Sequence, residues 1–354
     1  GRWGALVRGE TYGLTGLGDR TTLAAFTTAD FDEQQTVQIG HDFRIGGEGL
    51  TLGAMLTHAW AEPELDDPAL RIRAKTLLAT LEATYPLIRT QATGLRAGAG
   101  LDLIDQRVRF NGLELSRDRL RVAFARLELD RSDPASFGLR PGYNAAEPRW
   151  RLAGRIELRQ GLDLFGASPS CGPAFAGCTA PGAVPPGRLE GDSGGTSLRF
   201  EAFGEFRPRP RLALVAGLRG QMTGDPLLSF EQYSAGNYTI GRGYDPGTLL
   251  ADRGLGVQAE IRYGSLVPSA PRRLAWQAFA FLDAARVSEA GRIPSLTGGR
   301  NLASAGAGLR AMLGDGARIE AMLAVPLERA GVPAVRPDPR LLLSFTTRLW
   351  PWSH

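Results

Sequence analysis

Residues 254–264 alternate between apolar and polar side chains with unusual regularity. The apolar positions are Leu255, Val257, Ala259, Ile261 and Tyr263, and the polar positions are Gln258, Glu260 and Arg262. A period of two predicts a β-strand, because successive side chains of a strand point to opposite faces of its sheet. A soluble sandwich points its charges outward to solvent, whereas a membrane barrel points them into its lumen and turns its apolar face to lipid. The pattern favours the membrane barrel.

Strand-like runs of about 10–14 residues recur along the whole chain and are separated by turn signals. We find no capped stretch with a helical period of 3.6 residues, so an all-β fold is expected rather than an α/β fold. The fifteen runs are 2–12, 20–29, 34–44, 49–60, 71–84, 92–104, 118–131, 149–162, 196–207, 211–222, 254–264, 274–284, 302–313, 317–327 and 340–350.

Composition limits the ways in which such a chain can meet a membrane. Its 354 residues are 43% hydrophobic, and none of its apolar runs approaches the length of a membrane helix. A spanning structure must therefore be a closed barrel, because an open sheet edge leaves backbone groups unsatisfied in lipid. The net charge of +4 is mild and gives no case for a nucleic-acid partner.

The connections between the runs differ in length. Those at 13–19, 44–49 and 207–211 are short, whereas those at 163–195 and 223–253 are long. Outer-membrane barrels have short periplasmic turns and longer extracellular loops, and they contain an even number of strands. If the short turns are periplasmic, the first run begins on the extracellular side. We therefore expect a sixteen-stranded antiparallel barrel of which residues 1–354 supply fifteen strands, with the first strand missing upstream.

Four segments in this order resemble a known family. They are GLTGLGDR at 13–20, the loop motif Arg242-Gly243-Tyr244, FLDAARV at 281–287, and the final pair NLASAGAGLRAML and IEAMLAVPL. Together they resemble the TpsB transporters of two-partner secretion, the haemolysin secretion/activation proteins. This family shares a superfamily with the outer-membrane protein insertases.

The resemblance implies a gate. Loop 223–253 should fold back into the lumen and place Arg242 against the inner wall, with Asp283 of the Phe281-x-Asp283 pattern as its partner. A guanidinium fits one carboxylate with two parallel hydrogen bonds, which suits arginine better than lysine to this contact. Gly243 would let the loop tip, which also carries Tyr244, turn sharply beside the wall.

The resemblance also implies partners. The barrel would export a secreted exoprotein of the TpsA type from the periplasm to the surface of a Gram-negative cell, without a cofactor or a metal. POTRA domains and the first strand would precede it. Lipid and lipopolysaccharide would surround it, and the barrel-assembly machinery would insert it. The alternatives are an insertase of the same superfamily, or a porin or structural anchor in a cell-surface assembly.

The two cysteines lie in the longest connection. Cys171 and Cys178 are flanked by glycine and proline, and neither a histidine nor a further cysteine lies nearby to complete a metal site. In an exported chain, this spacing predicts a small disulfide loop.

One motif suggests a different class of protein. Residues 191–195 read Gly-Asp-Ser-Gly-Gly, like the nucleophile motif of a serine protease, and His58 and Asp102 precede Ser193 in the order of such a triad. Leu56-Thr57-His58-Ala59 does not match the histidine motif of those proteases, and Asp102 lies within an alternating run. We therefore expect no catalytic residue. The histidines, His41, His58 and His354, are too scattered to predict a metal site.

Overall fold

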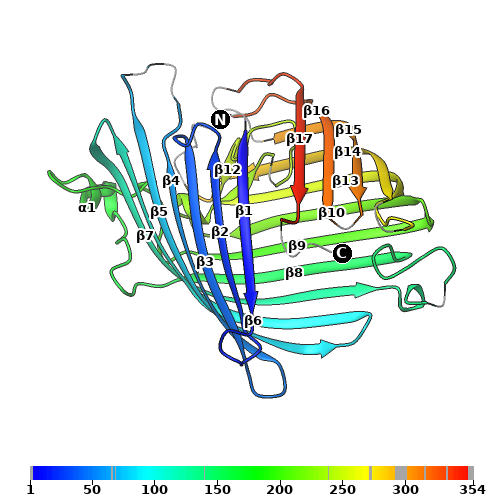
Figure 1. Ribbon diagram of the computed structural model, residues 1–354. Coiled ribbons are helices and arrows are strands. Elements are labelled where there is room, and N and C mark those ends of the chain that lie inside the picture. Colours follow the sequence, from blue (N-terminus) through cyan, green and yellow to red (C-terminus); the bar gives the residue numbers. More distant parts are fainter. Residues whose placement is uncertain are drawn as a thin grey trace.

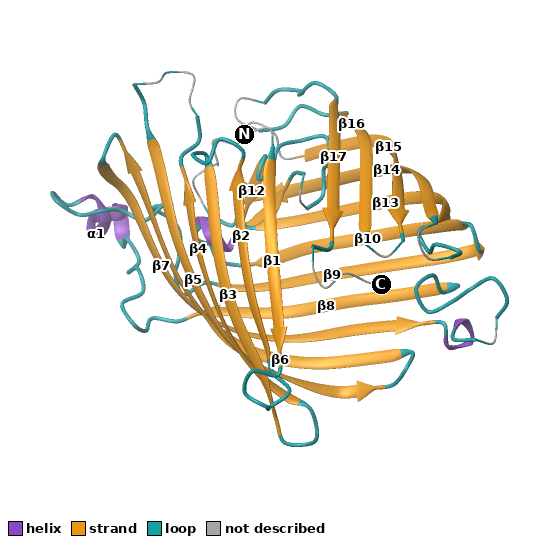
Figure 2. Cartoon of the chain, in the orientation of Figure 1, coloured by secondary structure: helices purple, strands orange, loops and turns teal. Residues whose placement is uncertain are grey.

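The protein folds as one large, strongly curved antiparallel sheet. The computed structural model describes residues 3–64, 67, 69–138, 140–237, 239–270, 273–291, 301–314, 316–331 and 334–349. Fifteen strands pair in chain order, and the sheet curls around a central lumen (Figures 1 and 2). They are β1 (Gly4–Tyr12), β2 (Arg20–Thr28), β3 (Gln34–Ile45), β4 (Leu50–Ala61), β5 (Ile72–Arg89), β6 (Thr93–Phe110), β7 (Leu113–Ser132), β8 (Trp150–Gly161), β9 (Thr196–Arg209), β10 (Leu212–Thr223), β13 (Arg253–Ser265), β14 (Leu274–Ser288), β15 (Asn301–Leu313), β16 (Ala317–Pro326) and β17 (Arg340–Thr347).

The alternation of apolar and polar residues in the sequence corresponds to the outer and inner faces of the barrel wall. On β13, Val257 and Ile261 are about half exposed on the outer face, whereas Glu260 between them is buried in the lumen. The same holds on β14, where Leu282 is exposed and Asp283 is buried. An apolar outer face with a charged inner face is the pattern of a transmembrane barrel. The expected all-β architecture and its fifteen strands are confirmed.

Two connections depart from the expected lengths. Strands β6 and β7 continue to a two-residue hairpin at Asn111-Gly112, where both residues have positive φ, so the expected long connection between 104 and 118 is wrong. An Asn-Gly pair favours such a turn because both residues tolerate positive φ. In contrast, the connection 133–149, on the side of the short turns, is long and contains a 3₁₀ helix, Pro134–Ser136.

Strands β1 and β17 are the two edges of the sheet, and they do not pair with each other in the part of the chain that the structure describes. The sixteenth strand stays a prediction. Among the described residues, no helix has the length and hydropathy needed to cross a membrane.

The turn 13–19 is closed by one carboxylate. Asp19 is buried, and its side chain accepts hydrogen bonds from the amides of Leu14 and Thr15, at 2.9 Å each, and from the Thr15 hydroxyl at 2.6 Å. The Thr15 hydroxyl is the largest cause that lowers the pKa of Asp19 from 3.8 to about 2. Hydrogen bonds to the charged form favour ionisation, so the turn is stable while Asp19 is ionised.

We expect Asp19→Asn to lower the unfolding temperature of the barrel at neutral pH. Because the folded pKa is below the unfolded one, this stabilisation is complete above about pH 4 and is lost as the pH falls through about 2. Heat-dependent gel mobility of the variant and wild type between pH 7 and pH 2 measures it. The exposed Asp32→Asn is the control, and a difference that does not shrink toward pH 2 would contradict this role of Asp19.

Candidate functional site in the lumen

Loop 223–253 covers part of the inner wall. It contains a small two-stranded sheet, β11 (Tyr233–Ala235) and β12 (Leu249–Ala251), that is separate from the barrel sheet (Figure 1). Most of its buried apolar side chains form one cluster with those of strands β14 and β15 and of the connection that follows β16. The members are Tyr233, Ala235, Ile240, Tyr244, Leu249, Ala251, Ala285, Val287, Leu302 and Ala330. The loop is therefore packed against the wall over its length.

Glycines of the wall make room for this packing. A Cβ at Gly254 would lie 2.1 Å from the ring of Tyr233, and one at Gly256 would lie 2.6 Å from the hydroxyl of the same residue. Both glycines belong to β13, directly beneath the loop. Their lack of a side chain lets the aromatic ring lie flat on the backbone of the strand.

Arg242 and Asp283 meet as the sequence led us to expect. The guanidinium of Arg242 donates two hydrogen bonds to the carboxylate, from Nε at 3.0 Å and from Nη2 at 2.8 Å. The backbone amide of Arg242 donates a third, at 3.0 Å. The Asp283 side chain is 1% exposed and that of Arg242 is 13% exposed. The pair is therefore bidentate and nearly dry.

A second carboxylate, which we had not predicted as a partner of Arg242, completes the contact. Arg242 Nη1 donates to Glu260 on β13 at 2.9 Å, and the guanidinium carbon lies 3.5 Å from the centre of the Phe281 ring. A cation over an aromatic face gains further attraction. We call Arg242 with Asp283, Glu260 and Phe281 the inner latch. Alternation had placed Glu260 on the polar face, but nothing in the sequence gave the strand register that brings it to Arg242.

The wall repeats this arrangement one step toward the short turns. Arg310 on β15 lies 3.8 Å from the centre of the Phe279 ring and donates to Glu260 at 2.6 Å and to Glu320 at 3.0 Å. Glu260 also accepts from Arg262 on its own strand, so it is shared between one arginine of the loop and two arginines of the wall. Glu260 would therefore keep two arginine partners even without Arg242.

The rest of the loop motif fits tightly against the wall. The hydroxyl of the fully buried Tyr244 lies 2.9 Å from the carbonyl oxygens of Ala303 and Glu328, and it accepts a hydrogen bond from the Glu328 amide at 3.0 Å. A Cβ at Gly243 would lie 2.9 Å from the backbone nitrogen of Pro326. Gly241 has φ +114°, a conformation that side-chain-bearing residues rarely adopt. The structure thus gives each predicted motif residue a contact, and their role in gating stays a prediction.

Arg242 stays positively charged over the physiological pH range. Burial disfavours its charged form, but the hydrogen bonds and charges of Asp283 and Glu260 outweigh burial and raise the pKa of Arg242. Arg242 therefore keeps its charge and its ion pairs over the physiological pH range.

The two ends of the loop meet at Asp252, which is fully buried. Its carboxylate accepts hydrogen bonds from Arg188 and from the amides of Leu227 and Ala290, the latter two at 2.9 Å each. Burial opposes ionisation of Asp252, but these hydrogen bonds prevail and lower the pKa of the carboxyl. Arg188 comes from connection 163–195 and Ala290 from the connection after β14, so Asp252 joins three connections at the base of the loop.

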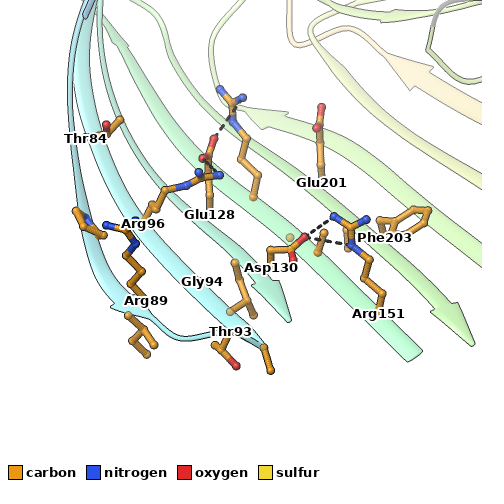
Figure 3. Close-up of a pocket in the computed structure, with 18 of the residues that line it drawn as sticks. Thr84, Arg89, Thr93, Gly94, Arg96, Glu128, Asp130, Arg151, Glu201 and Phe203 are labelled. Carbon is orange, nitrogen blue, oxygen red and sulfur yellow. Dashed lines mark hydrogen bonds and ion pairs between the residues drawn. The ribbon is translucent and has the colours of Figure 1, made fainter. Parts of the chain in front are cut away.

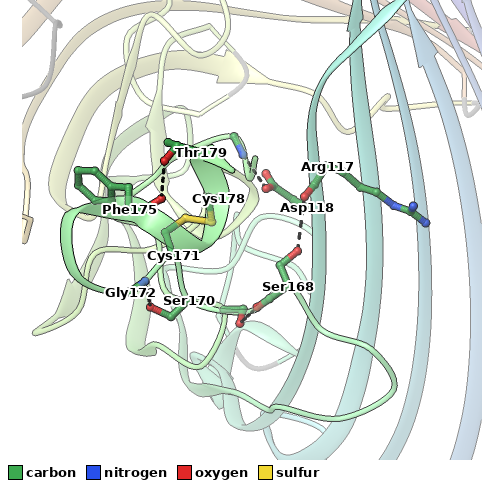
Figure 4. The surroundings of a disulfide bond; sticks show 11 residues. Arg117, Asp118, Ser168, Ser170, Cys171, Gly172, Phe175, Cys178 and Thr179 are labelled. Atoms are coloured by element: carbon green, nitrogen blue, oxygen red, sulfur yellow. Dashed lines mark hydrogen bonds between the residues drawn. A yellow bond between two sulfur atoms is a disulfide. The ribbon is translucent and has the colours of Figure 1, made fainter. Parts of the chain in front are cut away.

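The disulfide between Cys171 and Cys178 is confirmed. It closes a short segment of connection 163–195 that overlaps α1 (Ala176–Thr179) (Figure 4). Nearby, the Ser168 hydroxyl donates to the carbonyl oxygen of Arg117 at 3.4 Å (Figure 4). It also accepts from the amide of Arg119, and the Asp118 carboxylate accepts from the amide of Gly187 at 2.7 Å. The disulfide therefore stiffens a connection that is already bound to strand β7.

The three residues of the protease-like order each have another partner. Ser193 donates to the carbonyl oxygen of Ser168 at 2.5 Å, Asp102 accepts from Arg159 at 2.7 Å, and His58 stacks on Trp60. In the described part of the chain, no three histidine, cysteine or acidic side chains are grouped to hold a metal. His354 lies outside the described residues.

A cavity of about 1220 Å³ lies in the lumen beside the loop tip, toward the short turns (Figure 3). Its lining is rich in arginine, and Arg96 and Arg151 reach Glu128 and Asp130 on the same wall. The lining arginines are Arg44, Arg89, Arg96, Arg151, Arg155 and Arg219, and the lining carboxylates are Glu128, Asp130 and Glu201. We call this polar cavity beside the loop tip the vestibule.

Comparisons with known proteins agree with the fold. CdiB from Escherichia coli superposes with a TM-score of 0.75 at 14% identity, covering 96% of this chain and 58% of that one. CdiB from Acinetobacter baumannii gives a TM-score of 0.68 at 17% identity, covering 97% and 56%. BamA from Haemophilus ducreyi lacking POTRA domains 1–3 gives a TM-score of 0.61 at 12% identity, covering 97% and 67%.

The chain thus spans less than three fifths of the length of the two CdiB structures. No curated protein sequence matched it. A family model matches residues 1–311, which are most of the chain. The chain therefore belongs to the haemolysin secretion/activation protein family ShlB/FhaC/HecB.

Proposed function

We propose that this chain is the translocation barrel of a two-partner secretion transporter in the outer membrane of a Gram-negative cell. An unfolded exoprotein enters from the periplasm, threads the lumen and folds outside, and the barrel acts without catalysis. Family membership supports this function, and the likeness to two CdiB structures supports the fold that it needs. The observation that carries the gate is the contact of Arg242 with Asp283 and Glu260.

The polar lumen suits an extended chain. Its arginines and carboxylates pair along the wall, so an unfolded segment in the vestibule would meet charged and hydrogen-bonding groups. The vestibule lies on the periplasmic side of the loop tip if the short turns are periplasmic. An arriving segment would therefore be held below the inner latch until the loop moves.

Two other functions have less support from the structural comparisons and from the packing of the loop. An insertase is favoured only by the BamA likeness, whose TM-score of 0.61 is below those of both CdiB structures. A porin needs a permanently open constriction, whereas loop 223–253 packs across this wall. The protein encoded by the neighbouring reading frame is the candidate substrate, and its appearance in the culture medium only when this transporter is present would test export directly.

Removing the loop is expected to raise the conductance of the reconstituted protein in planar bilayers several-fold. The variant replaces residues 229–251 with a short Gly-Ser linker and keeps Leu227 and Asp252, which hold the base of the loop together. Shortening the exposed segment 180–184 of the neighbouring connection is the control and should leave conductance unchanged. A wild-type protein that already conducts as well as the loop-deleted one would favour a porin and contradict the gate.

A further inference from the structure

The base of loop 223–253 makes a second charged contact with the wall. Glu231 closes a 3₁₀ helix, Ser229–Glu231, and is 5% exposed. Arg159 on β8 donates to its carboxylate from Nε at 2.8 Å and from Nη2 at 2.9 Å. Arg199 on β9 donates from Nη2 to the same carboxylate at 2.9 Å. A carboxylate held by two guanidinium groups, one of them bidentate, is a strong and directional contact.

Other residues of the wall hold the two arginines in place independently of the loop. Arg159 also donates to Asp102 at 2.7 Å and to Glu157 at 3.0 Å, and its guanidinium lies 5.7 Å from the centre of the Phe124 ring. Arg199 donates to Gln221 at 2.8 Å. The wall therefore presents a built receptor for one carboxylate of the loop.

This contact is the inner latch with its charges reversed. In the inner latch, the loop supplies an arginine to carboxylates of the wall. Here the loop supplies a carboxylate, Glu231, to arginines of the wall. Even the packing is repeated, because a Cβ at Gly100 would lie 2.5 Å from the Phe124 ring, as one at Gly306 would from the Phe281 ring.

The two contacts lie on opposite flanks of the loop. The loop leaves the sheet from β10 and rejoins it at β13, which are neighbours. Glu231 reaches back to β8 and β9, and Arg242 reaches forward to β14. Breaking either contact alone leaves the loop held on the other flank.

We propose that Glu231 with Arg159 and Arg199 is an outer latch, and that the loop leaves the lumen only when the outer and inner latches have both been released. This assignment rests on the proposed function, since it adds a second restraint to the same gate. It makes Glu231 a positioning residue for the loop tip, which lies eleven positions further along the chain. A substrate that engages only the inner latch would then be held back.

Trypsin cleavage after Arg242 measures release, because this bond is protected while the tip lies against the wall. The protein is reconstituted in vesicles, digested briefly, and its peptides are identified by mass. We expect Glu231→Gln to raise the rate of cleavage at Arg242 about tenfold, although the inner latch is unaltered; this corresponds to roughly 1.4 kcal/mol. Glu231→Asp keeps the charge and should restore most of the protection.

The control is Asp130→Asn, which removes a lumen carboxylate that pairs with Arg151 of the wall and not with the loop. Only protein with the heat-dependent gel mobility of a folded barrel is compared. If Asp283→Asn raises cleavage and Glu231→Gln does not, the outer latch is wrong and the gate stands. If neither variant raises cleavage, the loop is not a gate, and both proposals are overturned.

Discussion

Asp283→Ala is expected to remove most export of the partner protein while the barrel still assembles. The substitution deletes the acceptor of three hydrogen bonds from Arg242 and leaves Glu260 as the only carboxylate of the inner latch. Breaking a buried pair by removing one partner costs about 3–5 kcal/mol, and the slight exposure of Arg242 places this pair toward the lower value. The tip then has no single position to which it returns after each opening, and it obstructs the path of the substrate.

Secretion of the substrate into the medium, normalised to folded transporter on a gel, measures this effect. Arg73→Ala is the control, since Arg73 also pairs with a carboxylate, Glu62, but its side chain is 54% exposed and belongs neither to the contacts of the loop nor to the lining of the vestibule. Exposed pairs contribute at most about 1 kcal/mol, so export by this variant should be near wild type. Normal export by the Asp283 variant would reject the inner latch as a functional contact.

Arg242→Lys refines the same prediction. Lysine keeps the positive charge but can neither bind Asp283 through two parallel hydrogen bonds nor lie flat on the Phe281 ring, as the guanidinium does at 3.5 Å. We expect export between that of the wild type and that of Asp283→Ala. Wild-type export by the lysine variant would mean that charge alone is sufficient and that the fork geometry has no role.

The strands could be predicted from the sequence because lipid on one face and the lumen on the other require apolar and polar side chains to alternate along each strand. Val257 and Glu260 are placed on opposite faces by this alone. The ends of strands were harder, because β6 and β7 extend through charged residues that read as a loop. The Asn111-Gly112 turn was an available signal for this hairpin.

Of the contacts between the loop and the wall, some could be predicted from the sequence and others could not. Arg242 and Asp283 were expected from the family resemblance, whereas the alternation in the sequence had marked Glu260 only as a lumen residue. Its contact with Arg242 depends on the register that sets Glu260 opposite Phe281, and a register cannot be read from either strand alone. The contact of Glu231 with Arg159 spans 72 positions and depends on the path of the loop inside the lumen. No local pattern encodes that path.

Gly306→Val is expected to reduce the yield of folded barrel sharply and to expose Arg242 in the fraction that folds. Gly306 on β15 lies opposite Phe281, and a Cβ there would be 2.5 Å from the ring and 2.1 Å from the carbonyl oxygen of Leu323. Overpacking forces side chains off their rotamers and shifts the backbone, which typically costs about 1–3 kcal/mol and sometimes more. The displaced ring would no longer lie beneath Arg242.

Gly154→Val is the matched control for this substitution. Gly154 also lies within a paired strand, β8, but the nearest atom to an added Cβ is the carbonyl oxygen of Glu201 at 3.7 Å, an ordinary contact. Folded yield and cleavage after Arg242 are measured for both variants. Reduced yield for Gly306→Val alone would identify the packing of Phe281 on a bare strand as part of the gate, because the ring supports both the wall and the guanidinium. Equal behaviour of the two valine variants would show instead that the wall tolerates a side chain beneath the inner latch, and the support of Arg242 would then come from its carboxylates alone.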